Sequence, residues 1–162
     1  MKKTLSAIAF ISFLYLNGFG QQLKTPSPSP TQTIKQEFGL SAIELSYSRP
    51  GVKSRKIFGD LVPYGKVWRT GANQATTISF GDSVIIGDRQ IPPGKYGLLT
   101  IPGPDEWTFI ITKQLDVTNP AAYKADQDLV RVQVRRQDFP FPVETFTILF
   151  SDVTSGSCDR AL

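Results

Sequence analysis

Apolar and polar residues alternate over several short stretches of this chain, which is the pattern of β-strands with one buried and one solvated face. The alternation is clean over residues 129–136, where Val130, Val132 and Val134 are expected to point inward. Further strands are predicted in the same way over residues 33–38, on a weaker signal, and over residues 42–48 and 144–150.

Residues 75–112 predict an antiparallel meander. Gly81-Asp82 and Gly87-Asp88 can each adopt the positive φ angles that two-residue hairpin turns require. Pro92-Pro93-Gly94 and residues 102–105 provide two further turns. The strands between these turns span residues 76–80, 83–86, 89–91, 95–101 and 106–112.

The order of these elements predicts the fold class. Asn119-Pro120 is expected to cap one short helical turn that ends near Asp126, and no long helix is predicted. Residues 57–73 show neither strand alternation nor helical periodicity, so they are expected to form a long ordered loop. We therefore predict an all-β protein, an antiparallel β-sandwich or small barrel rich in meander connections, with one long ordered loop and at most a short helical turn.

The N-terminal residues have the features of a secretory signal. Lys2 and Lys3 precede a short apolar run over residues 5–16, and Gly18 and Gly20 are small residues before a cleavage point at position 21. We predict a signal peptide over 1–20, a Pro/Ser/Thr-rich linker over 21–32 and a single β domain over 33–162. We expect the mature chain to be periplasmic or secreted and to have no transmembrane segment, because the apolar run is too short to span a bilayer comfortably.

The last residues of the chain have the pattern of an incomplete β-strand. Residues 158–162 have the pattern of the start of a strand, but five residues are few for a closing strand. We therefore expect the chain to be truncated after Leu162, with an unpaired edge at that point.

The charge of the chain argues against a nucleic-acid partner. Eighteen Lys and Arg residues against 14 acidic residues give a net charge of +4. Removing residues 1–20 deletes two lysines, which lowers the net charge to about +2. Such a charge is typical of a mixed, solvated protein surface, so we predict no nucleic-acid partner.

The residue types that are missing exclude several chemistries. The chain has no histidine, which excludes Ser-His-Asp and Cys-His nucleophiles and every histidine-ligated metal site. Cys158 is the only cysteine, so an intrachain disulfide is impossible. No Asp-x-Asp-x-Asp-Gly calcium loop is present. We predict no metal site, no cofactor and no catalytic residue.

The sequence resembles a bacterial family known as domain of unknown function 2911. The matching pieces are Tyr47-Ser48-Arg49-Pro50-Gly51, Ile57-Phe58-Gly59, the run from Leu61 to Asn73 (LVPYGKVWRTGAN) and Pro93-Gly94-Lys95-Tyr96. The resemblance implies export by a bacterium and a compact β domain, and it brings no catalytic residues. Gln74 departs from the Glu that similar sequences often have, and similar sequences continue past Leu162 into a last strand.

Six residues in and near the long loop are candidates for ligand binding. A guanidinium recognises carboxylate or phosphate, aromatic rings stack on sugars, and an amide both donates and accepts hydrogen bonds. Each residue also has a structural alternative: Trp68 as a core anchor, Arg49 and Arg69 paired with carboxylates such as Asp60 or Glu37, and nearby glycines as turn residues. The candidates are Arg49, Tyr64, Lys66, Trp68, Arg69 and Asn73.

Weaker signals lie outside this loop. Arg131 and Arg135 share one strand face, with Arg136 beside them, and they form either an anion-binding stripe or a solvated face. Asp105-Glu106 and Asp126-x-Asp128 are paired carboxylates of the kind that glycoside hydrolysis requires, but both occur in predicted turns.

Three hypotheses for function follow from these residues. The first is an exported, non-catalytic β domain that binds a saccharide, an anionic small ligand or a cell-envelope component through the Arg49/Tyr64–Asn73 region. The second is a histidine-free hydrolase or lyase that uses carboxylates with Tyr or Arg, which requires two acids to converge in a pocket. The third is a purely structural module, in which the six candidate side chains are buried or paired with one another.

Overall fold

The computed structural model describes residues 25–154 and 159–161. The predicted signal peptide and Cys158 lie outside these residues. The first strand, β1 (Thr31–Phe38), begins two residues before the predicted Thr33, inside the range assigned to the linker.

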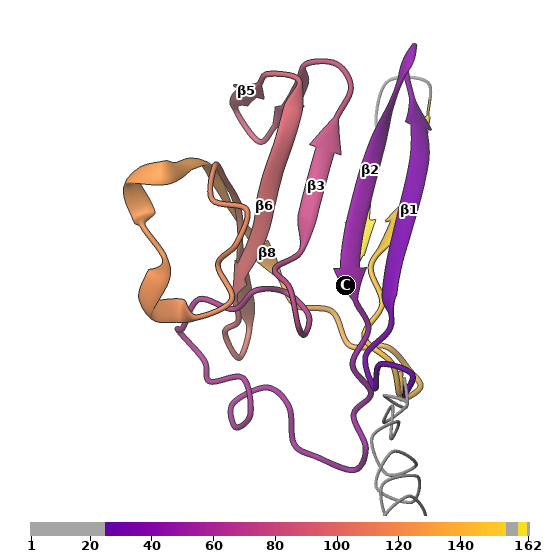
Figure 1. Ribbon diagram of the computed structural model, residues 1–162, viewed down its shortest axis with the longest axis vertical. Helices are drawn as coiled ribbons and strands as arrows, with labels where there is room; N and C mark the ends of the chain where they lie inside the picture. Colours follow the sequence, from indigo (N-terminus) through magenta and orange to yellow (C-terminus); the bar gives the residue numbers. More distant parts are fainter. Residues whose placement is uncertain (1–24, 155–158, 162) are drawn as a thin grey trace, which may run out of the picture.

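Six strands form the main sheet, and every neighbouring pair is antiparallel. The prediction of an all-β, antiparallel fold is confirmed. The predicted meander over residues 75–112 is interrupted, because the strand at Thr77–Phe80 pairs directly with the one at Gly94–Ile101 and residues 84–91 form a separate hairpin. Figure 1 shows β1, β2, β3 and β6 side by side as long ribbons. The sheet order is β1, β2 (Ser41–Ser48), β3 (Thr77–Phe80), β6 (Gly94–Ile101), β7 (Glu106–Thr112) and β8 (Asp128–Arg135).

The remaining elements are short. Strands β4 (Val84–Ile86) and β5 (Arg89–Ile91) form a hairpin, and β9 (Leu149–Ser151) pairs with β10 (Asp159–Ala161). Two 3₁₀ turns, η1 (Pro120–Ala122) and η2 (Ala125–Gln127), replace the single predicted helical turn. Asn119 caps the first as expected, because its Oδ1 accepts the Ala121 N–H at 3.0 Å.

The main core lies on one face of the sheet. Ile43, Ile78, Leu98 and Ile111, from four adjacent strands, are each no more than 5% exposed. On the opposite face, Leu99 and Ile110 form a second cluster with Val117 from the loop that follows β7. The central strands are therefore apolar on both faces, which explains the continuous apolar run in β6 and β7.

The prediction of a strand over residues 144–150 is wrong for all but its end, because only Leu149 and Phe150 belong to β9. The preceding residues bind partners outside a strand ladder: Phe146 N–H donates to Pro50 O at 2.9 Å, and Ile148 N–H donates to the Tyr47 hydroxyl at 3.0 Å. Phe146, Ile148 and Phe150 nevertheless pack on the main core, as their alternation predicts.

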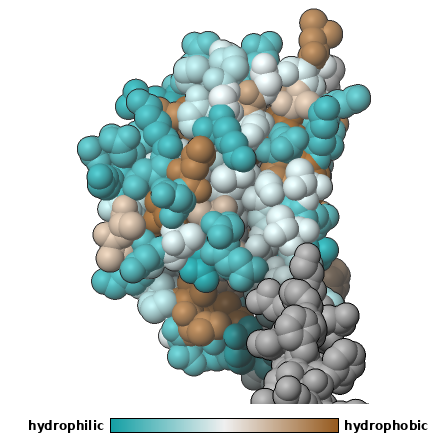
Figure 2. Space-filling model, viewed as in Figure 1, coloured by the Kyte–Doolittle hydropathy of each residue, from teal (hydrophilic) through white to brown (hydrophobic). Residues whose placement is uncertain are grey.

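The surface visible in Figure 2 is largely hydrophilic, with an apolar patch at its lower end over the long loop. Leu61 in that loop is 57% exposed. Within the part of the chain that the structure describes, no helix is long and apolar enough to cross a membrane.

The Tyr47 hydroxyl provides a test of how residues 144–148 are held. It is buried, accepts from Ile148 N–H, and lies within donating distance of Ile148 O (3.3 Å) and Gln32 Oε1 (3.0 Å). Tyr47→Phe should lower the free energy of unfolding by about 1–3 kcal/mol in urea denaturation, because it leaves buried backbone groups unpaired. The matched control is Tyr96→Phe, whose exposed hydroxyl donates only to Pro92 O and should cost less than about 0.5 kcal/mol. Equal losses in the two variants would contradict this account.

Candidate functional site: an aromatic groove with basic side chains

The long loop is tied to the sheet near its C-terminal end. Trp68 forms an isolated β-bridge with Thr100 of β6: Trp68 N–H donates to Thr100 O at 2.7 Å, and Thr100 N–H donates to Trp68 O at 3.0 Å. Beneath this bridge, the buried hydroxyls of Thr70 and Thr100 lie 3.0 Å apart, and the Thr76 hydroxyl donates to Thr70 O. The loop is therefore an ordered extension of the sheet.

Positive φ angles in the loop are supplied mainly by glycine. Gly59, Gly65 and Gly71 have φ of 80°, 69° and 150°, as expected of turn residues. The Tyr64 ring packs directly on Gly59, so closely that a Cβ at Gly59 would lie 2.6 Å from a ring carbon. A side chain at position 59 would therefore displace Tyr64.

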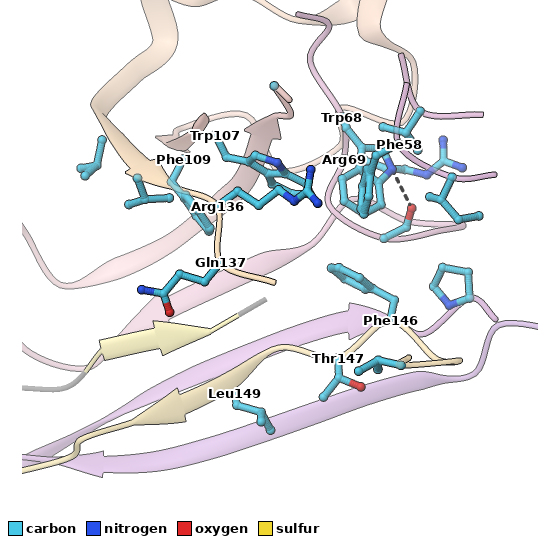
Figure 3. Close-up of a pocket in the computed structure, with 18 of the residues that line it drawn as sticks. Phe58, Trp68, Arg69, Trp107, Phe109, Arg136, Gln137, Phe146, Thr147 and Leu149 are labelled. Carbon is cyan, nitrogen blue, oxygen red and sulfur yellow. Dashed lines mark hydrogen bonds between the residues drawn. The ribbon is translucent and has the colours of Figure 1, made fainter. Parts of the chain in front are cut away.

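Four aromatic side chains, two from the long loop and one each from β7 and the segment before β9, form one cluster. The Trp68 ring lies 5.7 Å from Phe58, 6.3 Å from Trp107 and 5.2 Å from Phe146, all edge-to-face. The Trp68 indole N–H donates to Gly71 O at 3.1 Å. In Figure 3, Phe146 points toward Trp68 and Phe58 from the opposite wall of the groove. Such pairs stabilise by about 0.5–1.5 kcal/mol each beyond the area they bury, so the cluster fixes the loop over the sheet.

Beside this cluster, an open groove of about 1950 Å³ is lined by the main sheet, the long loop and parts of residues 139–152. Its sheet wall includes Trp107, Phe109 and Val134. The opposite wall carries Phe139 and Phe141, which are 55% and 61% exposed. Five basic side chains line it against two acidic ones, namely Arg55, Lys66, Arg69, Arg135 and Arg136 against Asp138 and Asp152.

The structure brings four of the six candidate residues to this groove and places two elsewhere. Tyr64, Lys66, Trp68 and Arg69 line it. Asn73 does not: its Nδ2 donates to Ser29 O at 3.0 Å, which holds the segment before β1. Among the described residues, none of the six side chains is hydrogen-bonded to another of the six. Arg49, Trp68, Arg69 and Asn73 each donate to backbone carbonyl groups.

Arg49 is also outside the groove lining. Its Nε donates to Phe146 O at 3.1 Å, and its Nη2 donates to the Thr147 hydroxyl at 2.9 Å. The expected ion pair with Asp60 or Glu37 is therefore wrong, because the guanidinium instead satisfies the irregular chain of residues 146–147. Arg49 positions one wall of the groove.

Arg69 also makes no ion pair with the carboxylates expected for it. Its Nη1 donates to Thr118 O at 2.8 Å. Its Nε is buried and has no hydrogen-bond partner among the described residues. A buried, unpaired donor costs free energy, so this atom lowers the stability of the loop's attachment.

Several groove residues were not among the candidates from the sequence, and Trp107, Phe146 and Arg136 are examples. Trp107 and Phe146 read as ordinary inward positions of strands, and their meeting with Trp68 depends on sheet pairing that spacing does not reveal. Arg136 follows β8 and extends toward the aromatic cluster in the view of Figure 3. It donates to Asp138 Oδ1 and to Pro104 O, at 2.9 Å from Nε and 3.0 Å from Nη1. The only sequence signal for Arg136 was its place beside Arg131 and Arg135.

The paired carboxylates of the hydrolase hypothesis have other partners. Glu106 lies 3.9 Å from Arg135. Asp128 accepts from Arg131 Nε at 2.7 Å and from the Tyr123 hydroxyl. Among the described residues, no group of three or more Cys, Asp or Glu side chains is placed to hold a metal ion.

The Tyr123–Asp128–Arg131 cluster has perturbed pKa values. Burial, reinforced by the hydrogen bond to Asp128, raises the pKa of Tyr123 to about 12. The hydrogen bond to Asp128 also raises the pKa of Arg131. None of the three lines the groove, so the cluster serves to join the loop after β7 to β8.

Trp68 should be important to stability as well as to the shape of the groove. Trp68→Ala removes three ring contacts and one hydrogen bond, and it should lower the free energy of unfolding by about 3–5 kcal/mol in urea denaturation. Trp68→Phe keeps an aromatic ring and should lose clearly less. A loss near 0.5 kcal/mol for Trp68→Ala, which is typical of surface substitutions, would show that the indole does not anchor the loop.

The raised pKa of Tyr123 predicts a pH dependence of stability. The folded state keeps the phenolic proton to about pH 12, whereas the unfolded chain loses it near pH 10. The contribution of this hydroxyl is therefore complete below pH 10 and is lost as the pH rises to 12. The difference in urea midpoint between wild type and Tyr123→Phe should be constant from pH 7 to 9 and shrink between pH 10 and 12. A difference that stays constant to pH 12 would contradict the assignment.

No match was found among curated proteins or among solved structures. The profile of one family, described as "Protein of unknown function (DUF2911)", matches residues 29–162. This range contains the whole β-sheet, the long loop and the groove-lining residues. The chain therefore belongs to the DUF2911 family.

Proposed function

We propose that this protein is an exported, non-catalytic binding domain whose groove takes a ligand with an extended apolar part and acidic groups. The observation that carries the proposal is the groove of about 1950 Å³ itself, which combines an aromatic wall with an excess of basic side chains. The signal-like N-terminus supports a periplasmic or extracellular location and hence a ligand from the cell envelope.

The apolar part of the ligand is inferred from exposed hydrophobic residues. Phe139, Phe141 and Val143 are each between 46% and 61% exposed, and all three line the groove. Leu149, at 52%, extends the same wall. Contiguous exposed apolar surface of this kind marks interaction sites in soluble proteins, because covering it removes apolar area from water.

The acidic groups are inferred from charge and from hydrogen-bonding capacity. Lys66 is exposed at the groove, and Arg69, which is partly buried, also lines it. A carboxylate, sulfonate or phosphate accepts charge-assisted hydrogen bonds from such groups. Among the ligands considered from the sequence, this favours an anionic amphiphile of the envelope over a neutral saccharide, because apolar side chains dominate the walls.

Binding of a fluorescent anionic amphiphile, 8-anilinonaphthalene-1-sulfonate, tests this function, alongside a panel of cell-envelope fragments and glycans. Arg69→Ala should weaken binding of the probe about tenfold, because it removes a charge-assisted contact. The matched control is Arg89→Ala in β5, an exposed arginine that does not line the groove, and it should bind as wild type does. Urea midpoints confirm that both variants fold. No binding, or equal binding by the two variants, would refute the proposal.

A further inference from the structure

The strand beside the groove is the last strand of the main sheet. β8 pairs with β7 on one side, and on its other side no strand of the described residues pairs with it. At its N-terminal half the β4–β5 hairpin is close, since a Cβ at Gly87 would lie 3.5 Å from Val132 Cγ2. The open part of the edge is therefore Gln133–Arg135.

The direction of the backbone groups along this edge follows from one hydrogen bond. Arg136 N–H donates to Asp105 O at 2.8 Å, so residue 136 faces β7. Residues of an antiparallel strand alternate in the side toward which their backbone groups point. Gln133 and Arg135 therefore direct N–H and C=O away from β7, and in the described part of the chain neither has a backbone partner there.

The side chains of the same strand alternate between the groove and the opposite face. Val132 and Val134 line the groove, and Val134 is 40% exposed. Gln133 and Arg135 are exposed on the other face of the strand, where Arg135 lies 3.9 Å from Glu106, and Arg135 also borders the groove at the end of β8. An added strand would thus place every second side chain beside Val134 in the groove and the others beside Arg135.

Charge decides which occupant fits the edge. A second copy of β8, paired antiparallel about Gln133, would place Arg131 opposite Arg135 twice on the same face, and like charges directly opposite are destabilising. A lipid or detergent has no backbone to pair with Gln133 and Arg135. A peptide can pair its backbone with the open edge, place apolar residues beside the valines in the groove and place acidic residues beside the arginines.

We propose that the open edge of β8 binds an extended segment of a partner protein in which apolar and acidic residues alternate, with its apolar side chains in the groove. The inference rests on the proposed binding function of the groove, and it identifies the ligand as a polypeptide. The free edge is short, so the groove contacts supply most of the affinity and the backbone hydrogen bonds set the register.

The test uses fluorescence anisotropy with a labelled ten-residue peptide that alternates valine and glutamate. Gln133→Pro removes one of the two N–H groups of the open edge that point away from β7 and leaves the β7–β8 ladder in place. It should weaken binding about tenfold relative to Gln133→Ala, which keeps that N–H. A peptide of the same sequence with alternate amides N-methylated should bind about tenfold more weakly to the unmodified protein, which tests the pairing even if Gln133→Pro does not fold. A peptide that alternates valine and lysine should not bind.

The outcomes separate this inference from the function on which it rests. Equal binding of the plain and N-methylated peptides would overturn strand pairing. Binding of the anilinonaphthalene sulfonate without any peptide binding would also overturn it, while the groove would remain a binding site. Failure of both probes would overturn both proposals. Concentration-dependent dimerisation in sedimentation that Gln133→Pro abolishes would assign the edge to a second copy instead.

Discussion

An apolar sheet face must be shielded from water, and the segments that cover the core face of the main sheet determine the arrangement of this protein. The face that carries Ile43, Ile78 and Leu98 is covered at one end by the β4–β5 hairpin and at the other by residues 144–151. Between them, the part of β7 and β8 around Trp107 and Val134 borders the groove. Among the described residues, the same constraint that builds the core thus leaves a partly exposed apolar surface that a ligand can cover.

Residues 144–148, which pack over the core face of the main sheet, are held largely by hydrogen bonds to side chains, because they do not form a complete strand ladder. Arg49 binds the carbonyl of Phe146, and the Tyr47 hydroxyl binds the backbone of Ile148. Each replaces a hydrogen bond that a neighbouring strand would otherwise provide. This arrangement lets residues 139–148 approach the sheet while their phenylalanines remain at the groove. The candidate ligand-binding residues therefore have two different roles. Arg49 and Asn73 support the segments around the groove, whereas Trp68 and Arg69 line it.

Local pattern was sufficient to predict much of the fold. The two-residue alternation around Leu45 and Val132 identified β2 and β8, because burial on one face is a property of the strand itself. The pattern failed at residues 144–148, where alternation was present but the partners were the distant side chains Tyr47 and Arg49. The groove was only partly foreseen for a similar reason. Trp68 and Arg69 belong to a conspicuous motif, whereas Trp107 reaches the cluster through strand pairing that spacing does not encode.

Stability and recognition are linked at this surface. Trp68 bridges the backbone of β6 and also packs against Phe146 on the far wall, so the residue that orders the loop also sets the width of the groove. A partner that covers Val134 and Phe141 would bind the folded state only, and such binding stabilises that state in proportion to the logarithm of partner concentration. The positive charge on β8 disfavours self-association. Arg131 and Arg135 would repel their counterparts in a second copy, whereas they attract acidic chains. The same arginines therefore disfavour pairing of the open edge with a second copy of β8 and favour its pairing with an acidic peptide.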